Sequence, residues 1–479
     1  MTDDRYRSPL GTRYASPEMQ RLWGEPRRIG LWRRVWLALA ESEQALGLPV
    51  GAEAVAAMRA HLDDADLAQA AAYEQRFRHD VMAHVHHFGD QAPAARGVIH
   101  LGATSAFVTD NADVVLLRDG LRLVLGRLLA VMDALARFAE THRALPCLAY
   151  THFQPAQLTT VGKRATLWLQ DLALDVETLL ERLAGLRLRG CKGTTGTQAS
   201  FLELFHGDHA KVRELERRFV AAMGFDACFA VTGQTYPRKQ DAQVLDALSG
   251  VAQSAAKMAH DLRLLQHENE LLEPFEREQI GSSAMAYKRN PMRAERINAL
   301  ARFVMGLQAN GAQTAATQWL ERTLDDSANR RLVLPEAFLA VDAILILAEN
   351  VAAGLEVRPE VVARHVREQM PFMATERWLM LGVEAGGDRQ ALHEVVRRHS
   401  LAAAERVARG EPNDLMDRLA GDAAFAKLPA RALAAELDPA RYVGRAPEQV
   451  GEFLDEYLRP LLARARPAAE AAARAEVRV

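Results

Sequence analysis

The chain of 479 residues is poor in cysteine: it contains only Cys147, Cys191 and Cys228, and no two of them form a CxxC pair. This spacing disfavours a structural zinc site or a disulfide framework and fits a reducing compartment. The charged N-terminal segment lacks the apolar core of a secretory signal. The longest apolar stretches, such as residues 343–348, are too short to span a bilayer. We therefore expect a cytoplasmic protein with no membrane partner.

The chain also lacks a strong excess of charge of either sign. Lysine and arginine together number 59 against 62 acidic residues, and the formal net charge is -3. A chain so close to neutrality has no overall field that would attract nucleic acid or an anionic membrane surface, and we expect neither as a partner. Local clusters of arginine are still able to bind a small anion.

Two glycine-rich nucleotide-binding motifs are missing. Gly162 and Lys163 lack the earlier glycine of the GxxxxGK[ST] pattern, because position 157 is a glutamine. The glycines within residues 190–196 are spaced three apart and do not form GxGxxG, and no strand is expected before them. The sequence therefore disfavours nucleotide hydrolysis and nicotinamide chemistry.

Apolar residues recur at steps of three and four along much of the chain, which is the period of an amphipathic helix. The clearest series run from Leu117 to Ala139, from Leu169 to Leu186 and from Val244 to Leu265. Long helices of this kind pack as an antiparallel bundle, and sustained alternation of period two is absent. We predict an all-α fold. Leucines on more than one helix face favour burial against other subunits, although the middle of a monomeric bundle gives the same pattern.

Breakers divide these helices. They lie at residues 144–146, 190–196 and 281–291, and residues 357–360 are typical of a boundary before a region of shorter helices. We predict three helical domains, with bounds taken from these breakers and from the family resemblance described below. They are an N-terminal domain of residues 1–104, a central long-helix bundle of residues 105–357 and a C-terminal domain of residues 358–479.

Polar segments stand out from this helical background. The sequences are RHDVMAH at 78–84, HLGATS at 100–105, THFQPAQ at 151–157 and GSSAMAYKRNP at 281–291. The last of these offers hydroxyl groups, backbone donors and cations to an anionic ligand, but a solvated loop with helix-capping serines explains it equally well. The segment at 151–157 lies directly before a long helix, so a capping region with a surface histidine is its simplest interpretation.

Histidines and a charge run raise two further possibilities. His79, His84, His86 and His87 are not spaced as the ligands of a helical metal site, and no carboxylate motif follows them, so we expect no metal. Within the charged run 321–331, arginine side chains are well shaped to grip a phosphate. On chemistry alone, a solvated run with internal Arg–Asp pairs is the better interpretation.

Taken together, these segments resemble the fumarase/aspartase superfamily. Residues 281–291 match its signature GSSxMPxKxNP except at Ala286, where the superfamily usually has proline. Alanine leaves the backbone more conformational freedom at this point than proline would. The ordered set SPLGTRYASPEM, RHDVMAHVH, HLGATS, THFQPAQLTTVGKR, KGTTGTQASF, TGQTYPRK and ERTLDDSANRR resembles the adenylosuccinate lyase family, in the form found in animals, over essentially the whole chain.

The resemblance implies a fold, an assembly and a reaction. It implies a homotetramer with a twenty-helix core, whose composite active sites each take residues from several subunits. It implies a nucleotide substrate and no cofactor. The expected reaction is β-elimination of fumarate from adenylosuccinate, giving AMP, and from the succinyl-carboxamide ribotide, giving the carboxamide ribotide of purine synthesis.

The resemblance also implies roles for individual residues. Ser282 corresponds to the base that removes the proton, and His152 to the acid that protonates the leaving nitrogen. His79 is expected to orient the substrate, and Glu295 to orient His152. Lys288 and Asn290 are expected to bind the succinyl carboxylates together with Thr104, Ser105 and Thr151.

The nucleotide end of the substrate is expected to contact a further set of residues. Within this set, Arg322, Ser327 and Arg331 are expected to grip the phosphate, so the resemblance reverses the interpretation of the charged run. The whole set comprises Arg13, Tyr14, Arg78, Asp80, Gln234, Arg296, Arg322, Ser327 and Arg331.

Two alternatives remain compatible with this pattern. One is a lyase of the same superfamily that acts on another succinyl substrate, which would have no use for the phosphate-binding set. The other is a structural homologue without activity, which would have no reason to keep Ser282, His152, His79, Lys288 and Glu295 together.

Overall fold

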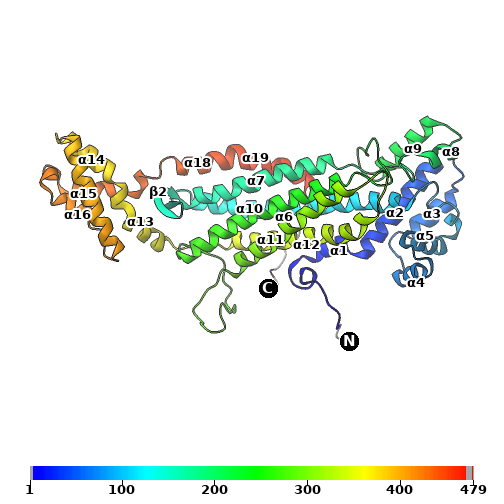
Figure 1. Cartoon of the computed structure of the whole chain (residues 1–479), viewed down its shortest axis with the longest axis horizontal. Helices are drawn as coiled ribbons and strands as arrows, with labels where there is room; N and C mark the ends of the chain where they lie inside the picture. The colour runs from blue at the N-terminus through cyan, green and yellow to red at the C-terminus, as the bar shows by residue number, and fades with distance from the viewer. Residues whose placement is uncertain (1–3, 471–476, 478–479) are drawn as a thin grey trace.

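A computed structural model gives the structure of the chain and describes residues 4–470 and residue 477. Long helices run side by side through the middle of an elongated molecule, and shorter helices gather at both ends (Figure 1). The predicted all-α fold is confirmed, with only short two-stranded sheets beside the helices in the described part of the chain.

The central bundle contains the predicted long helices. Because their apolar stripes face one another, α10 packs against α11, α12 and α7, while α6 packs against α7 and α12. The bundle helices are α6 (Ser105–Thr141), α7 (Val161–Gly185), α10 (Lys239–His267), α11 (Met292–Thr317) and α12 (Asp325–Ala353). The three apolar series of the sequence lie in α6, α7 and α10, with α7 ending one residue before the last leucine of its series.

Shorter helices cover one end of the bundle. The helix α2 packs against α6 and α9, and α4 packs against α5 (Figure 1). The first element of the chain is the π-helix η1 (Leu10–Tyr14), and α8 and α9 join the N-terminal helices at this end from later in the chain. The helices are α1 (Pro17–Trp23), α2 (Glu25–Ala45), α3 (Ala52–Ala60), α4 (Leu67–Phe77), α5 (Asp80–Gln91), α8 (Ala199–Leu204) and α9 (His209–Ala222).

The opposite end of the molecule has a second apolar core, formed around Trp378, Leu392 and Phe425. Its helices are α13 (Pro359–Met373), α14 (Thr375–Glu384), α15 (Arg389–Ala408), α16 (Leu415–Ala420) and α17 (Ala430–Ala434). The chain then returns along the bundle as α18 (Ala446–Glu452), η6 (Phe453–Leu458) and α19 (Arg459–Ala465).

The returning helices bury their apolar residues in the core of the central bundle. Val450, Leu458 and Leu462 are enclosed there, and α18 and α19 pack against α7. The end of the chain therefore does not share the core of α14–α17, although both fall within the predicted domain of residues 358–479. The division of the chain at residues 104 and 357 stays a prediction.

Two short antiparallel sheets interrupt the helices. The hairpin of β1 (Pro146–Thr151) and β2 (Gln154–Thr160) pairs Thr151 with Gln154. The strands β3 (Leu271–Leu272) and β4 (Glu356–Val357) form the second sheet. The segment 151–157, interpreted from sequence as a helix-capping region, is thus the tip and second strand of a hairpin.

A buried acid on α2 makes the stability of this fold depend on pH. Glu43 is fully enclosed, and within residues 4–470 and 477 neither of its carboxyl oxygens has a hydrogen-bond partner. Burial raises the pKa of Glu43 to about 9. At neutral pH the folded chain therefore keeps a proton that the unfolded chain releases, so unfolding becomes more favourable as pH rises from about 4.5 towards 9.

We expect Glu43→Gln to remove this dependence, because a glutamine side chain carries no charge to bury. The variant should match the parent at pH 5 and exceed its unfolding free energy at pH 8 by about 2–4 kcal/mol. Urea unfolding at the two pH values measures the difference. Parallel pH profiles for the two proteins would show that Glu43 is not buried as a neutral acid.

Candidate active site

A cavity of about 650 Å³ opens between α2, α5, α6 and α12. Residues of the polar segments line it together with residues of the charged run. The predicted site residues on its wall are Arg78, His79, Asp80, Thr104, Ser105, Gln234, Arg322, Ser327 and Arg331. Segments far apart in the sequence therefore meet on the wall of one cavity.

Helix capping places His79. Arg78 ends α4 in the left-handed conformation, and His79 is the N-cap of α5, where its Nδ1 accepts a hydrogen bond of 3.3 Å from the Met82 backbone N–H. An acceptor at Nδ1 leaves the imidazole proton on Nε2, which lies 3.3 Å from the Ser105 hydroxyl. In this tautomer the ring offers an N–H donor on the side that faces Ser105.

The loop before α6 is fixed by packing. His100, at a positive φ of 70°, accepts a hydrogen bond of 2.9 Å from the Trp36 indole at Nδ1. Burial lowers the pKa of His100 to about 4, which keeps the ring neutral. At Gly102 a Cβ atom would lie 2.8 Å from Phe201, so only glycine fits. These contacts position Thr104 and Ser105 at the start of α6.

Two arginines of the charged run are already paired with carboxylates. Arg331 donates to Asp80 at 2.7 Å, and Arg322 donates to both oxygens of Asp326 at 3.0 and 3.1 Å. Burial opposes ionisation of Asp80, but the Val81 backbone N–H and Arg331 outweigh it and hold the pKa of Asp80 below its ordinary value. The Arg–Asp pairing within the charged run, expected from chemistry alone, is present for Arg322 and Asp326, while Arg331 pairs with Asp80 of α5. Both arginines also line the cavity.

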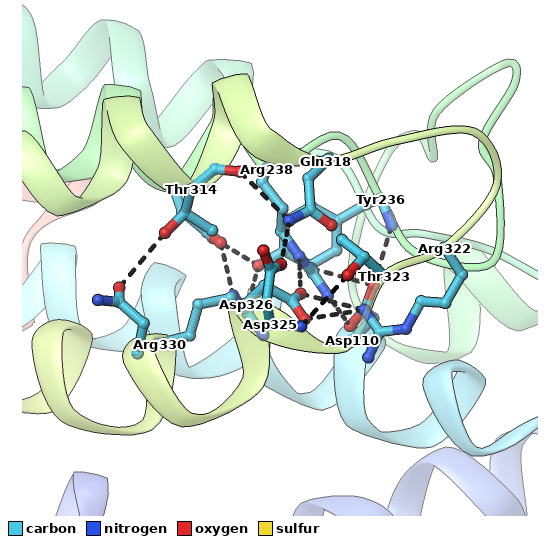
Figure 2. Close-up of polar contacts among 12 residues, drawn as sticks. Asp110, Tyr236, Arg238, Thr314, Gln318, Arg322, Thr323, Asp325, Asp326 and Arg330 are labelled. Atoms are coloured by element: carbon cyan, nitrogen blue, oxygen red, sulfur yellow. Dashed lines mark hydrogen bonds and ion pairs between the residues drawn. The ribbon is translucent and has the colours of Figure 1, made fainter.

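Sequence reasoning missed a buried ionic network that lines the cavity. Arg238 donates to Asp110 and Asp326 (Figure 2). Arg330 donates to Asp241 at 2.7 Å. Burial alone would raise the pKa of Asp110, but Arg238 and Arg330 outweigh it and lower that pKa. A signal was present, because Asp110 lies on the apolar face of α6, where an unpaired carboxylate would be costly.

The remaining predicted residues lie outside this cavity. Tyr14 of η1 lies under the Arg296 guanidinium, 5.7 Å from it, and Arg13 precedes Tyr14. Ser282, Lys288 and Asn290 belong to the long loop between β3 and α11, and Glu295 lies in the first turn of α11. The Asn290 amide donates to the Gly281 carbonyl at 2.8 Å and closes the loop on itself. The substrate-binding role of Asn290 stays a prediction.

Thr151 and His152 form another separate group at the tip of the β1–β2 hairpin. The hairpin lies at the opposite end of the bundle from α4 and α5 (Figure 1). Among the described residues, no hydrogen bond joins His152 to Glu295, the residue predicted to orient it. Within one chain, the hairpin tip and the cavity residues of α5 therefore lie at opposite ends of the bundle (Figure 1).

Comparison with solved structures shows the fold class. The chain is similar to 3-carboxy-cis,cis-muconate lactonizing enzyme from Pseudomonas putida, with a TM-score of 0.80 and 23% identity over 96% of this chain and 99% of that one. It is also similar to fumarate lyase from Mesorhizobium sp. BNC1, with a TM-score of 0.78 and 23% identity over 94% of this chain and 98% of that one. The family profile described as "Lyase" matches residues 14–306. The protein is a lyase of the fumarase/aspartase superfamily.

Sequence relatives identify the family within this class. Adenylosuccinate lyase from Saccharomyces cerevisiae is 51% identical over 94% of each chain, and that from Schistosoma mansoni is 48% identical over 96% of each. The profile described as "Adenylosuccinate lyase C-terminus" matches residues 371–453. The chain belongs to the adenylosuccinate lyase family, as the ordered sequence segments predicted.

Within the described part of the chain, no helix combines the length and the apolar character needed to cross a bilayer. Among the same residues, no group of three or more histidine, cysteine or acidic side chains is placed to hold a metal ion.

Proposed function

We propose that the protein eliminates fumarate from adenylosuccinate, giving AMP, and from the succinyl-carboxamide ribotide, giving the carboxamide ribotide. The observation that carries this proposal is the cavity, which combines arginines and hydroxyl groups suited to a phosphate with the His79 N–H donor. Relatives named adenylosuccinate lyase at up to 51% identity support the choice of substrate.

The elimination needs a base for a weakly acidic C–H bond next to a carboxylate. We assign this role to Ser282. Its hydroxyl oxygen accepts hydrogen bonds from the backbone N–H groups of Ala284 at 3.3 Å and Met285 at 3.1 Å. Such donors stabilise the deprotonated form of the oxygen, and the Lys288 ammonium in the same loop adds a positive charge. The base takes the carbon-bound proton, and the electron pair moves into the neighbouring carboxylate.

The C–N bond then breaks, and the leaving nitrogen needs a proton. We assign this proton to His152, which the exposed hairpin tip presents to its surroundings. The Nε2–H of His79, together with Thr104 and Ser105, is suited to donate to the negatively charged succinyl carboxylates. Glu295 orients His152 in this proposal, through a contact with another subunit.

The phosphate end of the substrate lies against Arg322, Ser327 and Arg331 in this proposal. Both guanidinium groups present further N–H donors beyond those used by Asp326 and Asp80, and forked donors match phosphate oxygens well. Arg78 and Gln234 lie on the same wall, and Arg13, Tyr14 and Arg296 complete the nucleotide contacts from a separate part of the fold.

We also propose that the protein is a homotetramer whose active sites combine residues of different subunits. The separation of the hairpin tip from the cavity supports this assembly (Figure 1). Bundle helices moreover expose large apolar side chains, which another copy of the chain would cover. They include Leu167 and Leu174 of α7, Leu264 of α10, Phe303 of α11 and Leu332 of α12.

An ultraviolet assay of the purified protein with adenylosuccinate tests the proposal, with fumarate and AMP quantified in parallel. We expect loss of substrate absorbance with fumarate and AMP released in equal amounts, and no need for an added metal or cofactor. Absence of turnover by a folded tetramer would contradict the proposal and favour a different succinyl substrate.

A further inference from the structure

One buried carboxylate of the cavity lining connects Arg322 to the buried ionic network. Asp326 is fully enclosed, and its Oδ2 accepts a hydrogen bond of 2.7 Å from the Arg238 Nε (Figure 2). Both Asp326 oxygens also accept from the Nη1 of Arg322, whose side chain reaches the cavity. Asp326 is thus shared between a buried guanidinium and a guanidinium on the cavity wall.

Arg238 is anchored on its other side. Its two terminal nitrogens donate to Asp110 of α6 at 3.0 and 3.2 Å. Asp110 also accepts from the Tyr236 backbone N–H at 2.9 Å, which fixes the segment that carries Gln234. Neither Arg238 nor Asp110 has appreciable solvent exposure, with 2% for each side chain. The support behind Asp326 therefore has little freedom to move.

This arrangement restricts an otherwise flexible side chain. An unrestrained arginine loses much rotamer freedom when it binds a ligand, and a partner that holds it beforehand reduces that loss. We propose that Asp326 is a positioning residue, which holds Arg322 in the orientation that grips the substrate phosphate. The proposal rests on the proposed function, because it takes Arg322 to be a phosphate ligand.

The variant Asp326→Asn tests the proposal directly. An asparagine amide presents N–H donors where one Asp326 oxygen accepts, so one of the two arginines has to move away. Arg322 is the side chain that can move, because it is partly exposed while Arg238 is enclosed. We expect the Kd for AMP and the KM for adenylosuccinate to rise about tenfold, with kcat changed by less than about twofold.

A double-mutant cycle separates positioning from a general structural effect. In an Arg322→Ala background, Asp326→Asn should change the Kd for AMP by less than about twofold, because the side chain that Asp326 positions is gone. Titration calorimetry with AMP gives these values without depending on turnover. An equal loss of affinity in both backgrounds, an unchanged affinity in Asp326→Asn, or a parent protein that does not bind AMP would each overturn the proposal.

A second variant leaves the buried carboxylate in place. Lysine keeps the charge of Arg322 but cannot reproduce its planar fork. If orientation matters, Arg322→Lys should bind AMP nearly as weakly as Arg322→Ala. Affinity close to that of the parent would show that charge alone suffices and would overturn the proposal. This comparison remains decisive if Asp326→Asn folds poorly.

Glu436 offers a matched control. It too is a buried carboxylate shared between two arginines, Arg377 and Arg441, but it lies in the turn directly after α17, at the opposite end of the molecule from the cavity. Glu436→Gln should lower the Tm without changing the Kd for AMP. The assay of adenylosuccinate turnover distinguishes the two proposals: AMP affinities that follow the cycle without turnover support the positioning role and contradict only the proposed reaction.

Discussion

Replacing Ser282 with alanine is expected to lower kcat for adenylosuccinate by about three orders of magnitude, because the variant has no group to accept the carbon-bound proton. The backbone donors of Ala284 and Met285, which face the Ser282 oxygen, would have no anion to stabilise. The Kd for AMP should change little, since the phosphate contacts of this proposal come from other elements. Steady-state kinetics and AMP titration measure the two effects separately.

The neighbouring serine provides the control. Ser283 lies in the same loop and is exposed, and its side chain has no hydrogen-bond partner among the described residues. Ser283→Ala should keep most of the activity, so that a loss specific to position 282 reports on chemistry and not on loop folding. Retention of more than about a tenth of kcat in Ser282→Ala would exclude this serine as the base.

Mixing two inactive variants is expected to restore activity. His152→Ala and Arg331→Ala should each lose about two orders of magnitude or more in kcat/KM, through loss of the acid and of a phosphate ligand. If each site takes its hairpin tip and its cavity from different chains, some sites of a mixed tetramer receive both intact residues. For random mixing in equal amounts, about a quarter of the sites should be complete.

Co-expression of the two variants with different tags, followed by purification through both tags, yields the mixed tetramers for assay. The control pairs Arg322→Ala with Arg331→Ala, which line the same cavity in one chain. No mixture of these two should regain activity. Mixed His152 and Arg331 tetramers that stay as inactive as either parent would show that one chain supplies both residues.

Much of the fold follows from the sequence, because helical period is a local property. The long series of apolar residues predict α6, α7 and α10, and the glycine- and proline-containing breakers fall between helices. The return of α18 and α19 to the bundle could not be predicted, because nothing local distinguishes an apolar stripe that packs on its neighbours from one that packs on a distant helix. The hairpin at 146–160 was missed because its strands are short and lie directly before a long helix.

Some residues of the candidate site could be predicted from the sequence, but the ionic contacts among them could not, for a similar physical reason. Its wall residues belong to segments with distinctive sequences, and the resemblance identified them. Arg238 and Arg330 also lie in such segments, but their ionic partners could not be predicted. Asp110 meets Arg238, and Asp241 meets Arg330, only when α12 packs against α6 and α10. A charged residue within an apolar stripe indicates that an oppositely charged partner exists, but the pattern does not indicate which residue that partner is.

The tip of the β1–β2 hairpin has a consequence for protein engineering. His152 and Phe153 occupy its two turn positions at φ values of 53° and 57°. Glycine and asparagine adopt such positive φ values at lower energy than other residues. Each such residue costs on the order of 1 kcal/mol in backbone strain. A design procedure that ranks substitutions by stability alone would therefore favour Asn-Gly at this turn. It would obtain a more robust hairpin and discard the side chain to which we assign the protonation of the leaving nitrogen.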